Sequence, residues 1–200
     1  SRGLGDVYKR QALHFSEGRF QSHFFQTART MLEHEDSAYY SLVEHSTSHI
    51  ETEHLVKFGM NLGYNSCTWG AQRIRRNEQR LGFNIPWTVL FQMDDLQCLD
   101  HLFEYDSAIT EGEQLGIYTW GLLSRTDPMA LLPLIEHHPD SAFFLFCRPE
   151  DVTSALLDEI IPIKHLMLVV RWEDGTDEVC AMLRLSLIHI SEPTRPLYIS

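Results

Sequence analysis

Four short apolar runs alternate with helix-like patterns along the second half of the chain. The runs, such as WTVLFQM and AFFLFC, are rich in aromatic and branched aliphatic residues, which is typical of strands buried on both faces. Between the runs, apolar positions recur at helical spacing, and Asp, Pro and Gly mark helix starts and ends. The predicted strands span residues 87–93, 117–123, 142–147 and 166–171, and the predicted helices span residues 107–115, 128–137 and 149–161, with a last helix beginning at Thr176.

This alternating order predicts an α/β protein whose strands form a parallel sheet with right-handed crossovers. Four βα units fit part of a parallel (βα) barrel, and they also fit an open, doubly wound sheet. A chain that stops after the fourth helix favours the partial barrel. We therefore expect a helical N-terminal region followed by a truncated parallel (βα) barrel of about four βα units. In either fold, active sites lie at the carboxyl ends of the strands.

The region before the first strand, residues 12–86, has a helical pattern. Phe20, Phe24 and Ala28 lie on one apolar stripe, and a later stretch from about Ser48 has its apolar residues on one side. Gly59 and Gly63 are expected to interrupt this stretch. A short charged helix is then expected over residues 72–81, ended by Gly82.

The two ends of the chain form a matched pair. A DNA sequence that encodes SRGLGDVYKRQ, residues 1–11, has a reverse complement that encodes LSLIHISEPTR, residues 185–195, at every position. Inverted copies of this kind resemble the adapters of transposase-based sequencing libraries. We therefore expect residues 1–11 to be adapter-derived, residues 185–200 to be adapter-derived or a tail, and the natural part to comprise the helical region 12–86 and the partial barrel 87–184.

Composition and charge exclude some classes of binding partner. The chain has 16 Lys+Arg against 28 Asp+Glu, a formal net charge of −12. Nucleic acids and anionic membrane surfaces attract basic patches, so the charge argues against both. No apolar run approaches the roughly 18 residues that a membrane span needs. The four cysteines form no CxxC pair, and no signal-peptide pattern is visible, so we expect a reduced, cytoplasmic protein.

Two stretches, residues 77–94 and 109–160, resemble radical S-adenosylmethionine (SAM) proteins in local order and spacing. In that family a helix ending in G-K-E-L-G precedes a strand ending in GGEP. A helix ending in HPD then leads to a strand ending in F-x-T-N-G. The resemblance implies a barrel framework from about residue 77 to residue 184, with residues 12–76 as an N-terminal extension. The matching framework residues are Leu115, Gly116, Pro128, His138, Pro139, Asp140, Phe144, Phe146, Asp158 and Glu159.

The functional motifs of that family are altered in this chain. The family places CxxxCxxC after its first strand, where three thiolates hold a [4Fe–4S] cluster that binds SAM. Here Cys98 corresponds to one ligand, and Leu102 and Tyr105 occupy the positions four and seven further on. SRTDP stands where GGEP is expected, and CRPE stands where TNG is expected. We therefore expect the cluster and SAM to be lost and predict no cofactor.

Several residues carry candidate chemistry of other kinds. Asp94, Asp95 and Asp127 follow predicted strands, where carboxylates can act as acid and base. Arg148 and Arg171 also lie at strand ends and can bind an anion, or they form surface ion pairs.

A second pattern suggests metal ligands in the N-terminal region. His45, His49 and Glu53 recur at helical spacing and can share a metal, or they form a polar helix face. His137 and His138 are expected to cap the C-terminal end of a helix, where positive charge is favoured.

Three functions remain open on these grounds. The first is a catalytically degenerate radical-SAM-like protein that acts in binding or regulation, with a peptide or protein as partner. The second is an enzyme that uses the same barrel without a cluster and acts from the strand-end residues. The third is an iron–sulfur redox protein whose further ligands lie beyond Arg184.

Overall fold

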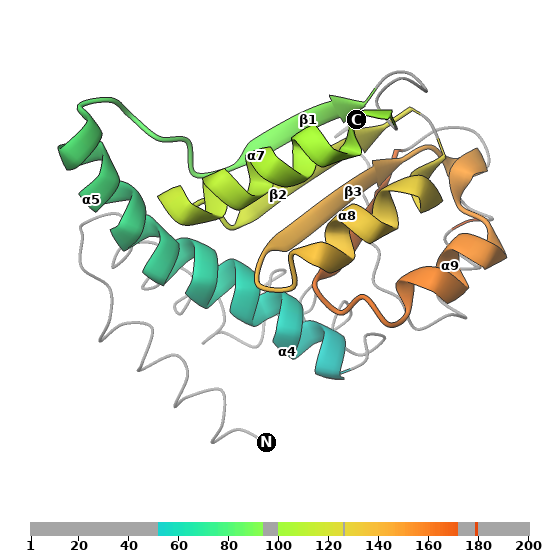
Figure 1. The fold of residues 1–200 in the computed structure, drawn as a ribbon. Coiled ribbons are helices and arrows are strands. Elements are labelled where there is room, and N and C mark those ends of the chain that lie inside the picture. Colours follow the sequence, from blue (N-terminus) through green and yellow to red (C-terminus); the bar gives the residue numbers. More distant parts are fainter. Residues whose placement is uncertain (1–51, 94–99, 126, 172–178, 180–200) are drawn as a thin grey trace, which may run out of the picture.

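A computed structural model describes residues 52–93, 100–125, 127–171 and 179 (Figure 1). It confirms the α/β class, with a long helical region ahead of four parallel strands that alternate with helices. The predicted helices within residues 12–51, both adapter-like ends and the helix expected from Thr176 lie outside the described residues. The elements in chain order are α4 (Thr52–Met60), the π-helical segment η1 (Asn61–Gly70), α5 (Ala71–Leu81), β1 (Val89–Met93), α7 (Leu102–Leu115), β2 (Thr119–Ser124), the 3-10 helix η2 (Pro128–Leu131), α8 (Leu132–His137), β3 (Ala142–Cys147), the 3-10 helix η3 (Pro149–Asp151), α9 (Ser154–Ile160) and β4 (Leu166–Val170).

The four strands form one open sheet in the consecutive order β1-β2-β3-β4, and every neighbouring pair is parallel. Right-handed crossovers between consecutive strands place all the connecting helices on one face of the sheet. Figure 1 shows α7 and α8 in front of the strands and α9 beside them at the right. A doubly wound sheet needs a reversal of strand order to put helices on both faces. That alternative is therefore wrong for the described strands.

The register explains which side chains form the core. Leu122, Leu145 and Leu168 are neighbours across β2, β3 and β4, and all are fully buried against the helices. Residues one position away point to the opposite face, since strand side chains alternate. There Phe144 is half-buried and contacts Phe58 of α4 with ring centroids 5.4 Å apart. The core therefore lies between the sheet and its single layer of helices.

The long helix from α4 to α5 runs across the amino ends of the strands (Figure 1). Gly70 and Gly116 permit this approach, because a Cβ on either glycine would overlap the carbonyl oxygen of the other. Gly116 also has a positive φ of 110° and ends α7, a conformation that favours glycine. A helix and a loop thus touch through their backbones.

Polar side chains of the long helix bind backbone carbonyls that precede the strands. Asn61 Nδ2 donates to Pro139 O at 2.9 Å and to Ser141 O at 2.7 Å. Asn65 Nδ2 donates to the backbone carbonyl oxygen of Asp140 at 2.8 Å. The bond to Ser141 O is buried, and a buried carbonyl needs a hydrogen-bond donor. Two further contacts of this region lie elsewhere: Asn77 Nδ2 donates to Leu115 O at the end of α7 at 3.0 Å, and His54 Nε2 lies 2.7 Å from Leu166 O in β4.

The expected interruption of the helix at Gly59 and Gly63 is wrong. Helical structure continues through both glycines, changing from α to π geometry at Asn61 and back to α at Ala71. A glycine inside a helix costs about 1 kcal/mol relative to alanine, which tertiary contacts readily outweigh. The tertiary contacts of this helix include those of Asn61 with the turn before β3 and of Gly70 with Gly116.

Gly112 provides a test of core packing. It lies inside α7, and an added Cβ would overlap the indole of Trp120, which is 1% exposed. We expect Gly112→Ala to lower the free energy of unfolding by about 1–3 kcal/mol through overpacking. Gly59→Ala in α4 is the matched control, because nothing lies within 4 Å of its added Cβ. The control should gain about 0.5–1 kcal/mol in urea unfolding. Equal effects of the two changes would contradict this packing.

His165 provides a test of pH dependence. Its Nε2 donates to Ile135 O at 2.9 Å, and burial lowers the pKa of the ring despite this bond. As the pH falls below the ordinary histidine value of about 6.5, the unfolded chain binds a proton that folded His165 does not. Stability is therefore lost on acidification through this window. In His165→Gln the amide keeps the donor but does not titrate.

The measurement is urea unfolding of both proteins at about pH 7.5 and about pH 5.5, on either side of the ordinary histidine pKa. Wild type should lose more stability between the two pH values than His165→Gln does. Identical losses would show that His165 titrates alike in the folded and unfolded states.

Candidate functional site

Of the candidate residues predicted at the carboxyl ends of the strands, the structure describes Asp127, Arg148 and Arg171. Asp94, Asp95 and Cys98, the expected counterpart of one cluster ligand, lie outside the described residues. Asp127 is exposed and caps η2, with its carboxylate accepting from the Met129 backbone N–H at 3.0 Å. This is the helix-starting role that the Asp-Pro pair predicts.

Arg148 forms ion pairs with neighbouring carboxylates at the carboxyl edge of the sheet. Its Nε and Nη2 donate to Asp151 at 3.0 and 2.9 Å, and its Nη1 lies 3.1 Å from Glu150 Oε1. Arg171 is exposed, and its backbone N–H donates to Cys147 O at 2.9 Å, so the two arginines follow adjacent strands. The Arg148 guanidinium already has carboxylate partners, which compete with any external anion.

The thiol of Cys147 lies at the same edge and is buried. Burial, together with the charge of Asp151, raises its pKa to about 12. The thiolate is the nucleophilic form of cysteine. Cys147 is therefore a protonated core thiol at neutral pH.

Potential metal ligands gather at a place that the sequence did not suggest. His45 and His49 lie outside the described residues, and Glu53 is exposed in the first turn of α4. Within the described part of the chain, Asp106 of α7 meets His137 and His138 at the end of α8, with one ligand atom from each within 4.8 Å of the others. We call these three residues the α7–α8 cluster.

The two histidines lie at the C-terminal end of α8 and contact carboxylates of α7. His137 Nδ1 is hydrogen-bonded to Asp106 Oδ1, and this bond, against the effect of burial, lowers the pKa of Asp106. His138 Nδ1 lies 3.3 Å from Glu113 Oε2. Burial lowers the pKa of His138, but Glu113 and Asp106 outweigh it and raise the pKa overall.

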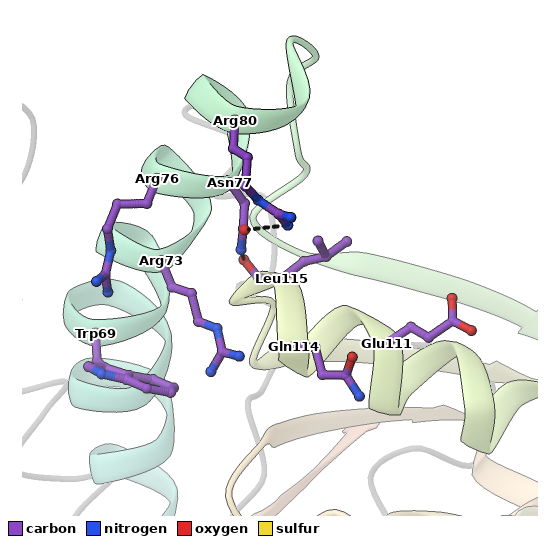
Figure 2. Close-up of a pocket in the computed structure, with 8 residues that line it drawn as sticks. All are labelled: Trp69, Arg73, Arg76, Asn77, Arg80, Glu111, Gln114 and Leu115. Carbon is purple, nitrogen blue, oxygen red and sulfur yellow. Dashed lines mark hydrogen bonds between the residues drawn. The ribbon is translucent and has the colours of Figure 1, made fainter.

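A groove of about 950 Å³ opens between α5 and α7 (Figure 2). Arg73, Arg76 and Arg80 line it from α5, and Glu111 and Gln114 line it from α7. In Figure 2, Arg73 extends from α5 toward the end of α7. Guanidinium groups bind carboxylates and phosphates with two parallel hydrogen bonds. The α5–α7 groove thus concentrates positive charge on a chain of net charge −12.

Contacts within the groove hold several of its side chains in place. The Arg73 guanidinium lies 5.1 Å from the ring centroid of Trp69, within cation–π range. Arg80 Nη2 donates to Asn77 Oδ1 at 3.1 Å, while Asn77 itself is bound to Leu115 O. A binding surface whose side chains are already ordered loses less entropy when a ligand binds.

Neither the cluster nor the groove was found by reading the sequence. The sequence predicts a short charged helix over residues 72–81 and a capping role for His137 and His138, and neither expectation points to a binding site. One signal was available, namely that this helix carries four arginines and one acidic residue in an acidic chain. Which elements lie opposite these residues is set by the fold.

The chain matches no protein-family model, and no curated protein or solved structure is significantly similar to it. What the fold defines is therefore a class, an α/β protein with a singly wound parallel sheet. Among the described helices, none has both the length and the apolar character that crossing a membrane requires.

Proposed function

We propose that this chain is a non-catalytic, cytoplasmic binding protein built on part of a radical-SAM-like (βα) framework. Its partner is a protein or peptide that presents an acidic segment to the α5–α7 groove. The observation that carries the proposal is the set of three arginines on one side of a single groove in an otherwise acidic chain.

The loss of the cluster motif supports a non-catalytic role. Leu102 and Tyr105, which stand where the family has its second and third cysteines, belong to α7 and pack against the hydrophobic core. The ring of Tyr105 lies 5.1 Å from that of Phe91. Both positions are therefore used for packing, and neither supplies the thiolate that holds a [4Fe–4S] cluster.

The composition of the groove favours a protein partner over a nucleic acid. Trp69 and Leu115 add apolar surface beside the arginines, and Trp and Arg are the residues that contribute most to protein–protein binding energy. Glu111 and the net charge of −12 oppose a long polyanion, whose binding requires an extended basic surface.

Binding is tested by fluorescence anisotropy with a labelled peptide of alternating glutamate and leucine, and with the lysine version of the same peptide. We expect only the glutamate peptide to bind, with an affinity that falls as salt screens the charges. Arg73→Ala should weaken binding by about tenfold, the effect of losing a side chain that contributes strongly to an interface.

Arg75→Ala is the matched control, because Arg75 is on the same helix but does not line the α5–α7 groove. It removes the same charge and should change the affinity by less than about twofold, as expected for a residue outside the interface. Equal losses in both variants would reduce the interaction to non-specific charge attraction. Tighter binding of a single-stranded oligonucleotide would overturn the choice of partner.

The absence of SAM chemistry is tested separately on protein purified anaerobically and incubated with iron and sulfide. We expect no iron–sulfur absorbance and no 5′-deoxyadenosine from added SAM, because only Cys98 remains of the cluster motif. A bound cluster or turnover of SAM would refute the non-catalytic assignment, whatever the peptide measurements show.

A further inference from the structure

We propose that Asp106, His137 and His138, the α7–α8 cluster, bind a divalent transition-metal ion, and that zinc fits the site best. The cluster is separate from the α5–α7 groove, and this proposal does not depend on the binding function. Two imidazole nitrogens and one carboxylate oxygen are a donor set that zinc readily accepts, whereas magnesium and calcium prefer oxygen ligands alone.

The geometry of the cluster suits a tetrahedral ion. Zinc lies about 2.0–2.2 Å from nitrogen and oxygen ligands, which places two tetrahedral ligands roughly 3.3 Å apart. His138 Nε2 lies 3.2 Å from Asp106 Oδ1, and the three residues each offer one ligand atom within 4.8 Å of the others. Metal binding would replace the hydrogen bond between His137 Nδ1 and Asp106 Oδ1.

The strongest sign of a missing ligand is the second nitrogen of His138. This side chain is only 4% exposed, and its Nε2 lies 3.2 Å from Asp106 Oδ1 without the geometry of a hydrogen bond. A buried nitrogen whose nearest carboxylate is poorly aligned for a hydrogen bond calls for an explanation. A metal ion held between Asp106 and His138 would satisfy both atoms.

A chain of hydrogen bonds orients His138 for this role. Trp120 Nε1 donates to Ser141 Oγ at 3.2 Å, and Ser141 Oγ donates to Glu113 Oε1 at 2.6 Å. The other oxygen of Glu113 faces His138 Nδ1 at 3.3 Å. A carboxylate that accepts from the far nitrogen of a metal-binding histidine fixes its tautomer and leaves Nε2 as the metal ligand. Glu113 is thus a positioning residue.

The site is accessible from solvent on one side. The side chain of His137 is 68% exposed and that of Asp106 is 24% exposed, while His138 closes the inner side. An ion can enter past His137, and a water molecule can occupy the fourth position of the tetrahedron. Three protein ligands and one water make an open site.

The proposal is tested by titrating the metal-free protein with Zn²⁺ alone, in competition with a coloured chelator, and by X-ray absorption of the loaded protein. We expect one ion per chain, with nitrogen and oxygen ligands at about 2.0–2.2 Å and no sulfur at about 2.3 Å. His137→Ala should weaken zinc binding by roughly 100-fold or more, because it removes a ligand from an exposed position. Glu113→Gln should weaken it by about 10–100-fold.

His101→Ala is the matched control. His101 is exposed and pairs with Glu104 at 3.0 Å, outside the cluster, so its loss should leave zinc affinity unchanged. The circular dichroism spectrum reports whether each variant is folded. Absence of a one-to-one complex in the wild type, sulfur ligands in the absorption spectrum, or equal losses in His137→Ala and His101→Ala would each overturn the proposal.

Discussion

The structure depends on satisfying the backbone carbonyls that precede the strands. A parallel sheet begins each strand after a turn, and the carbonyls of these turns have no partner in the sheet. The long helix from α4 to α5 supplies the donors. Asn61 and Asn65 bind the turn before β3, and Asn77 binds the end of α7. The backbone of the same helix also packs at Gly70 against Gly116, which follows α7. Side-chain donors and close backbone packing therefore act together to hold the helix across the strand ends.

These contacts also create both candidate sites. Asn77 ties α5 to the last turn of α7, and the space left between the two helices is the groove lined by arginines. Asn61 holds the turn that follows His138, so that this histidine faces the carboxylates of α7. The helix α7 therefore contributes to two sites. Its Glu111 and Gln114 line the groove. Its Asp106 and Glu113 face His137 and His138.

The residues that resemble the radical SAM framework have physical roles of their own in this chain. Gly116 adopts the positive φ that ends α7, and Pro128 follows the cap at Asp127. Asp140 presents its carbonyl to Asn65. Such roles keep a (βα) framework in place whether or not a cluster is bound, because they concern turns and packing and not the chemistry of iron.

Much of the fold could be predicted from the sequence, because its signals are local. Near-continuous apolar runs predict strands, and β3 has its predicted bounds of Ala142–Cys147. Burial on both faces is wrong for β1 in the described structure, because Leu90 is 59% exposed. The cap at Asp127 follows from a two-residue motif. The sequence could not decide between a singly and a doubly wound sheet, because strand order depends on contacts between distant segments. For the same reason the sequence did not reveal the groove or the α7–α8 cluster, because both join residues that are distant along the chain. Asp106 and His137, for example, are 31 positions apart. Local chemistry thus determined the elements, and only the tertiary structure decided which side chains face one another.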